Sequence, residues 1–99
     1  MLNINKKVEN GKAVIMPEGR LDTVTAPQME GIIKEIIPEI SELILDFKNL
    51  EYISSAGLRI LLSAQKAMNM HGKMTLCNVN ETIMEIFEVT GFSEILTIE

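Results

Sequence analysis

The stretch YISSAGLRILL, residues 52–62, holds two adjacent serines between a short apolar pair and an apolar run. A serine oxygen can do three kinds of work at such a place. It can cap a helix by accepting a hydrogen bond from a free backbone N–H, attack a substrate as a nucleophile, or receive a phosphate. Ser54 and Ser55 are therefore the first candidates for chemistry in this chain.

The nucleophile interpretation fails on spacing. The nucleophile elbow of hydrolases has the pattern G-x-S-x-G, and here Gly57 follows Ser55 by two residues but Ile53 precedes it. The one histidine, His71, is expected at the far end of the same helix, roughly 20 Å away at about 1.5 Å of rise per residue. A general base must lie within about 3 Å, and Lys66 is also about three turns along. The sequence therefore predicts no serine hydrolase.

Other enzyme sites find no support in the residue pattern. The phosphate-binding pattern G-x-x-x-x-G-K-[S/T] is missing from the sequence. One histidine and one cysteine, Cys77, give no metal-ligand spacing. We therefore expect no enzyme activity, no cofactor and no metal, and we expect Cys77 to be a small buried side chain.

Composition and charge exclude further classes. The formal net charge is −5 and aromatic residues make up 4% of the chain, whereas nucleic-acid binding needs basic surface and often stacking rings. No stretch reaches the ~20 apolar residues of a membrane span, and the N-terminal segment lacks the apolar region of a signal peptide. A single cysteine fits a reducing compartment. We expect one cytoplasmic, monomeric domain over residues 1–99 that binds neither nucleic acid nor membrane.

The elements that must position these serines begin with a hairpin. Residues 2–8 predict a short edge strand and residues 13–17 a buried one. Asn10-Gly11 between them is a strong signal for a tight turn. Pro17 is expected to end the second strand or to cost it a ladder partner, because proline has no N–H to donate.

An amphipathic helix should follow the hairpin. Thr25 and Gln28 have the spacing of a capping box. The apolar residues after them recur with a period near 3.6. Pro38 should stop this helix, since the residue before a proline leaves helical geometry.

The two serines should lie between the next strand and the next helix. Residues 42–47 predict a central strand covered on both faces, because three apolar residues are consecutive there. The segment KNLEY, residues 48–52, predicts a turn. The apolar residues after the serines predict a helix that ends at Gly72.

The last third of the chain completes an alternating order. A strand near residues 73–79, a helix capped by Asn80 and ended by Gly91, and a closing strand near residues 94–98 give the order β-β-α-β-α-β-α-β. Strands alternating with helices imply a largely parallel sheet with helix cover. The opening hairpin makes the sheet mixed. The predicted fold class is therefore α/β, a single domain with helices packed against a mixed central sheet.

This element order favours a modified serine. A residue that follows a strand and opens a helix lies at the carboxyl edge of the sheet, where function tends to sit. A phosphate there would meet the positive end of the helix dipole, worth ~0.3–1 kcal/mol. It would also add about −1.5 to −2 charges to the surface. Capping needs only one serine, so capping and modification both stand as interpretations.

Two motifs, GRLDTVTAP at residues 19–27 and LILDFKNLEYISSAGLRILL at residues 43–62, resemble the STAS domain of bacterial anti-sigma factor antagonists. The resemblance covers essentially the whole chain. It implies that Ser55 is phosphorylated by the anti-sigma factor, a serine kinase. The family often has aspartate where this chain has Ser54, which makes Ser54 the second choice for the phosphate acceptor.

The resemblance implies a partner-switching function. The unphosphorylated protein would bind its anti-sigma kinase and release a sigma factor for transcription. Phosphorylation of Ser55 would block that binding, and a separate phosphatase would restore it. The aspartate of the family's G-x-L-D motif corresponds to Asp22. The expected partner-binding residues are Asp22, Thr25, Ser54, Gly57, Leu58 and Arg59.

Alternatives remain for the function and for single residues. STAS domains also act as adaptors without phosphorylation, in lipid-transport complexes or beside anion transporters. Asp22 can equally well bond backbone amides near a helix start, and Thr25 can act as a cap. Arg59 can be an ordinary exposed helix residue.

Overall fold

The computed structural model describes residues 2–99. Five strands and three α-helices are found in this range. The strands are β1 Leu2–Glu9, β2 Lys12–Leu21, β3 Glu42–Asp46, β4 Leu50–Ile53 and β5 Lys73–Cys77. The helices are α1 Ala26–Ile36, α2 Ser55–Asn69 and α3 Glu81–Thr90.

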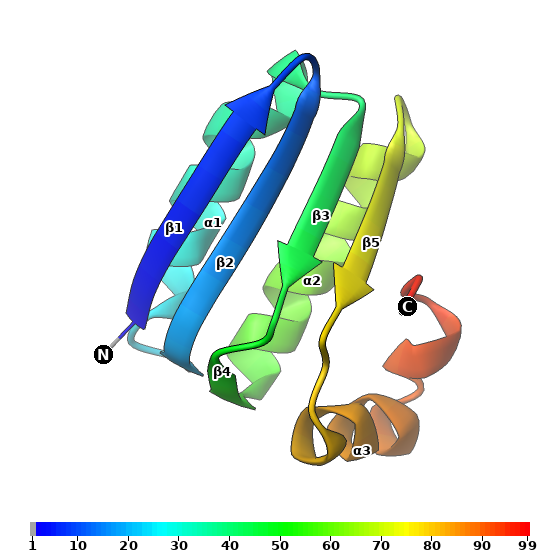
Figure 1. Ribbon diagram of the computed structural model, residues 1–99. Helices are drawn as coiled ribbons and strands as arrows, with labels where there is room; N and C mark the ends of the chain where they lie inside the picture. Colours follow the sequence, from blue (N-terminus) through cyan, green and yellow to red (C-terminus); the bar gives the residue numbers. More distant parts are fainter. Residues whose placement is uncertain (1) are drawn as a thin grey trace.

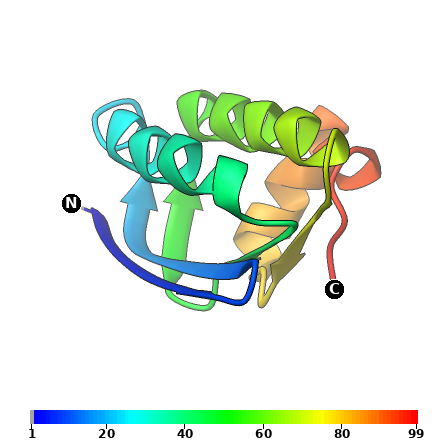
Figure 2. The same cartoon turned by 90° about the horizontal axis from the view of Figure 1, so that it is seen from above.

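All five strands belong to one mixed sheet. Neighbouring strands follow the order β1-β2-β3-β5, and β4 pairs with β2 beyond the stretch where β2 pairs with β3. Only the pairing of β1 with β2 is antiparallel. Helices α1 and α2 lie together behind the sheet in Figure 1, and Figure 2 shows both on the same side of it. The predicted fold class is confirmed.

The hairpin turn is confirmed, and the prediction for Pro17 is half right. Asn10 and Gly11 have φ values of 51° and 77°, the left-handed geometry that a two-residue hairpin turn requires. β2 does not end at Pro17 but continues to Leu21. Its pairing with β3 stops at Ile15 and its pairing with β4 starts at Gly19. Pro17 therefore lies where β2 has no parallel neighbour, and its missing N–H is tolerated.

The capping box predicted for α1 is wrong. Thr25 occupies the N-cap position, but its side chain makes no cap hydrogen bond to the helix. The Gln28 amide Nε2 donates to the carbonyl oxygen of Leu2 at 3.2 Å instead of reaching back to Thr25. Both side chains bond to residues outside the helix, and the four-residue capping-box pattern does not include those residues. The predicted end is confirmed, since α1 stops at Ile36 before a 3₁₀ turn that carries Pro38.

The element order differs from the prediction in two places. Residues 48–52 were predicted as a turn, but the last three of them form β4 together with Ile53. The predicted closing strand is reduced to one bridge between Leu76 and Ile98, because a 3₁₀ turn over Phe92–Glu94 leaves few residues to run beside β5. The caps of α3 are as predicted: Asn80 accepts a hydrogen bond from the N–H of Ile83, and Gly91 has φ 83°.

Side chains from the sheet and the helices form one core. Leu43 and Leu45 of β3 are fully buried, whereas Ile44 between them is half-buried. The prediction of a strand covered on both faces is therefore wrong, because α1 and α2 lie on the same side of the sheet (Figure 2). The helices contribute apolar residues at helical spacing, among them Met29, Ile33, Leu61, Met68, Ile83 and Phe87. Burying one such side chain stabilises the fold by about 1.5–3 kcal/mol. Within residues 2–99, no helix is both long and apolar enough to cross a membrane.

Candidate functional site

Two chain segments leave the sheet side by side at one edge. β2 and β4 end at Leu21 and Ile53, which pair in register. The backbone N–H of Ser54 donates to the carbonyl oxygen of Leu21 at 2.9 Å. Asp22 follows the first strand and Ser54 follows the second, so the two motifs come together at this end of the sheet. This edge lies at the lower end of the sheet in Figure 1.

The two serines have different roles. Ser54 has extended backbone geometry, and its hydroxyl oxygen accepts a hydrogen bond from the N–H of Gly57 at 3.4 Å, so Ser54 is the N-cap of α2. It is half-buried. Ser55 is the first residue of α2 and is exposed. No hydrogen bond described within residues 2–99 involves its side chain. Ser54 caps α2, so the Ser55 hydroxyl is not needed for capping and is free to be modified.

Gly57 and Leu58, in the first turn of α2, lie below the exposed Ser55. Both are buried. A Cβ at Gly57 would come within 2.6 Å of Cγ1 of Ile53, so only glycine lets α2 pass this close to β4. Leu58 packs into the core at 7% exposure. Their positions favour a structural role in holding the helix start, in place of the predicted direct contact with a partner.

Asp22 organises the loop between β2 and α1. One of its carboxylate oxygens accepts hydrogen bonds from the backbone N–H groups of Val24 and Thr25, each at 3.1 Å. These bonds, the one from the Thr25 N–H foremost, hold the pKa of Asp22 below its ordinary value of 3.8. The buried Thr25 hydroxyl accepts from the N–H of Asp22 at 2.9 Å and donates to the carbonyl oxygen of Arg20 at 2.8 Å. The loop is therefore held in one conformation with Asp22 ionised.

Other residues at this edge were not predicted to belong to the site. Val24 projects from the Asp22 loop with 86% of its surface exposed, unusual for an apolar side chain held in a fixed loop. The guanidinium of Arg20 lies 4.3 Å from the ring centroid of Tyr52, on the neighbouring strand, in a cation–π contact. No local sequence pattern predicts the exposed Val24 or the Arg20–Tyr52 contact, because both depend on how β2, β4 and the loop are placed. Arg59, which was predicted, is exposed on α2 one turn after Ser55.

The groups that could make this site catalytic lie elsewhere. The His71 ring Nε2 is 3.0 Å from the carbonyl oxygen of Ile37, beyond the other end of α2. Cys77 is half-buried and not fully buried as predicted, because it is the last residue of β5. Burial still raises the pKa of its thiol, so it is a poor nucleophile near neutral pH. Among residues 2–99, no three His, Cys, Asp or Glu side chains lie together as metal ligands would.

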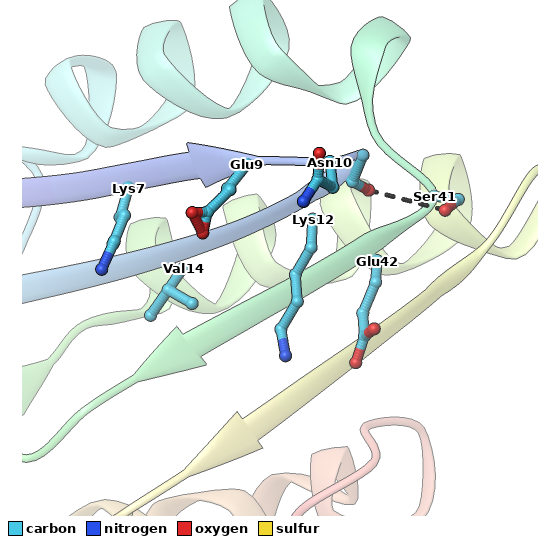
Figure 3. Close-up of a pocket in the computed structure, with 8 residues that line it drawn as sticks. Lys7, Glu9, Asn10, Lys12, Val14, Ser41 and Glu42 are labelled. Carbon is cyan, nitrogen blue, oxygen red and sulfur yellow. Dashed lines mark hydrogen bonds between the residues drawn. The ribbon is translucent and has the colours of Figure 1, made fainter.

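A depression of about 440 Å³ lies at the opposite end of β2, beside the hairpin turn (Figure 3). Charges of alternating sign line it, since Glu9 pairs in register with Lys12 and Lys12 with Glu42. The Ser41 hydroxyl donates to the carbonyl oxygen of Gly11 at 3.5 Å, the dashed line in the figure. Cross-strand pairs of this kind stabilise a sheet modestly. This depression is therefore best explained as a solvated end of the sheet.

A comparison of the sequence with known protein families gives one clear match. The family model described as "STAS domain" matches residues 3–99. The chain belongs to the STAS domain family. The exposed serine after β4 and the aspartate after β2 lie at one end of the sheet of this STAS domain.

Named relatives match this STAS domain over most of its length. It is 31% identical over 94 residues to BtrV of Bordetella bronchiseptica, an alignment that covers 90% of this chain and 78% of the relative. It is 27% identical over 100 residues to the anti-sigma F factor antagonist of Paenibacillus polymyxa, covering 98% of this chain and 86% of the relative.

Solved structures share the fold. An anti-sigma factor antagonist from Mycobacterium paratuberculosis superposes with a TM-score of 0.90 at 20% identity, covering 99% of this chain and 85% of that one. The phosphorylated form of the Bacillus cell fate determinant SpoIIAA gives 0.77 at 20% identity, with 98% and 91% covered. A sulfate transporter family protein from Wolinella succinogenes gives 0.76 at 22% identity, with 92% and 75% covered. At these identities the likeness concerns the fold alone.

Proposed function

We propose that this STAS domain is an anti-sigma factor antagonist that is switched off by phosphorylation of Ser55. The unmodified protein binds an anti-sigma serine kinase, and this binding releases a sigma factor for transcription. The observation that carries the proposal is the exposed, unbonded hydroxyl of Ser55 at the start of α2. The names of the relatives, anti-sigma factor antagonists among them, support it.

The modification itself needs no catalytic group from this chain. The kinase transfers the γ-phosphoryl group of ATP to the Ser55 oxygen, the bond to ADP breaks, and the hydroxyl proton is released. A separate phosphatase hydrolyses the ester and restores the free hydroxyl. Ser54 is the less suitable acceptor, because its oxygen is engaged in the cap of α2 and the residue is half-buried. The protein acts as a binding partner in the cytoplasm, as a monomer, and not as an enzyme.

The docking surface consists of Asp22, Val24, Ser55 and Arg59. Val24 offers apolar area, Asp22 a fixed negative charge and Arg59 a positive charge. A phosphate on Ser55 would have to be buried against the kinase beside the ionised Asp22. Burying a charge without a partner costs several kcal/mol, and each 1.4 kcal/mol weakens binding about tenfold. Phosphorylation can therefore abolish binding while the core stays intact.

The adaptor alternative shares the same fold, as the sulfate transporter family protein illustrates. An adaptor that is never phosphorylated does not require a free hydroxyl at this position, whereas the switch does. The affinity of such an adaptor for its partner would not change on Ser55→Ala substitution or on phosphorylation of Ser55. The exposure of Ser55 meets the requirement of the switch, and the names of the relatives favour the switch over the adaptor.

Phosphate uptake tests the proposal. The purified protein is mixed with ATP and the anti-sigma kinase from the same genome, and intact mass is measured over time. Wild type and Ser54→Ala should each gain one phosphate, and Ser55→Ala should gain none. Equal uptake by Ser55→Ala and wild type would refute Ser55 as the acceptor.

A further inference from the structure

Ser55 and Arg59 occupy positions i and i+4 of α2, and both are exposed. Side chains with this spacing are neighbours on a helix surface, with about 5–6 Å between their Cβ atoms. Helical side chains also lean toward the N-terminus of their helix. A side chain as long as that of Arg59 can therefore reach back over the turn that begins with Ser55.

Neither side chain takes part in a hydrogen bond or ion pair described within residues 2–99. The ion pairs described within residues 2–99 join Lys34 to Glu30 and Lys73 to Glu42, and Arg59 takes part in neither. Arg20, the second arginine in the sequence, is stacked on Tyr52. Arg59 is therefore the arginine on the helix that is available to a negative group one turn before it.

We infer that phosphorylated Ser55 is paired with Arg59 within the first turns of α2, so that the modification also withdraws the Arg59 guanidinium from the docking surface. This inference rests on the proposed function, because it concerns the phosphate that the kinase adds. Phosphorylation then weakens binding in two ways. It adds negative charge where the kinase docks, and it occupies the positive charge that Arg59 offers to the kinase.

The chemistry of the two groups suits this pairing. A phosphate presents three strong acceptor oxygens, and a guanidinium presents a planar fork of N–H donors that can bind two of them at once. Asp22 follows Leu21, whose carbonyl oxygen accepts a hydrogen bond from the N–H of Ser54, and its carboxylate carries the same sign of charge as a phosphate. Like charges repel, so Asp22 disfavours a phosphate that turns toward its loop, whereas Arg59 offers a charge of the opposite sign on the helix itself.

The pair can be tested without the kinase. Phosphoserine is incorporated at position 55 during translation in the full chain, in wild type, in Arg59→Gln and in Arg59→Lys. Lys66→Gln serves as the matched control, since it removes the same charge from the exposed side of the same helix about three turns away. Phosphorus NMR then follows the titration of the phosphate in each protein.

The second pKa of the phosphate should be lower in wild type than in Arg59→Gln by about 0.2–0.4. Lys66→Gln should match wild type, and Arg59→Lys should fall between. The rise in Tm on phosphorylation should also be about 2 °C larger in wild type than in Arg59→Gln. Identical titrations in wild type, Arg59→Gln and Lys66→Gln would overturn the inference. Because no kinase is involved, that result leaves the proposed function standing, whereas lack of phosphate uptake at Ser55 from the kinase refutes the function and not the pair.

Discussion

Gly57→Ala is the substitution that most directly probes how the site is held. A Cβ at this position would lie 2.6 Å from Cγ1 of Ile53 and 2.9 Å from Cγ of Leu21. Both neighbours are fully buried, at 1% and 0% exposure, so neither can swing into solvent. The substitution must therefore displace α2 from the ends of β2 and β4, and Ser55 moves with the helix.

The expected cost follows from two opposing effects. Overpacking a core typically costs about 1–3 kcal/mol. Alanine in a helix interior gains up to about 1 kcal/mol over glycine, but Gly57 lies in the first turn, where the gain is smaller. We expect a net loss of roughly 1–2 kcal/mol in the free energy of unfolding. For a chain of this size, each kcal/mol lowers Tm by about 4–8 °C.

Thermal unfolding followed by circular dichroism measures the effect, with Gly31→Ala as the matched control. Gly31 is an exposed glycine inside α1, and a Cβ there would meet nothing within 4 Å. Gly31→Ala should stabilise the protein by about 0.5–1 kcal/mol, so the two glycine-to-alanine substitutions should change Tm in opposite directions. If Gly57→Ala is as stable as wild type, α2 does not depend on this close approach to the sheet, and the account of the site is wrong.

Three further predictions concern the capping serine, the exposed valine and the loop aspartate. Ser54→Ala should lower the free energy of unfolding by about 0.5–1 kcal/mol through the lost cap, and Ser55→Ala should change it by less than about 0.5 kcal/mol; equal losses in urea titrations would contradict the division of roles. Val24→Ser should weaken kinase binding about tenfold in calorimetry, and Val89→Ser, equally exposed at 82% on α3, should not; equal affinities for all three proteins would remove Val24 from the docking surface. The pKa of Asp22 is lowered in the folded state, so its contribution to stability is complete above the ordinary value of 3.8 and is lost as the pH falls through the lower folded value. The difference in the free energy of unfolding between wild type and Asp22→Ala should shrink over that acid range. A difference that does not change with pH would contradict the role of the ionised Asp22 in holding the loop.

The sequence predicted those features that depend on neighbours along the chain. Asn10-Gly11 requires left-handed geometry at two successive residues, which a hairpin turn supplies. Asn80 and Gly91 likewise bound α3 through local capping. An exposed serine after a strand could be predicted from the element order, and so could the approach of the Asp22 segment to it, once the resemblance to the STAS domain was recognised.

Features that depend on distant neighbours could not be predicted this way. Thr25 and Gln28 have the spacing of a capping box, but the carbonyl oxygens of Arg20 and Leu2 compete successfully for their side chains. β4 is only four residues long and exists because it pairs with the end of β2. The need for glycine at position 57 comes from Ile53 and Leu21 pressing on it, and no periodicity reveals that contact.

Calorimetric titration of the anti-sigma kinase with two forms of this protein, unmodified and carrying phosphoserine at position 55, tests the central claim most directly. The account predicts that the phosphorylated form binds at least about a hundredfold more weakly, which corresponds to roughly 3 kcal/mol. Circular dichroism should be the same for both forms, since Ser55 lies outside the core. Equal affinities of the two forms would contradict the switch and would favour an adaptor that binds its partner regardless of phosphate.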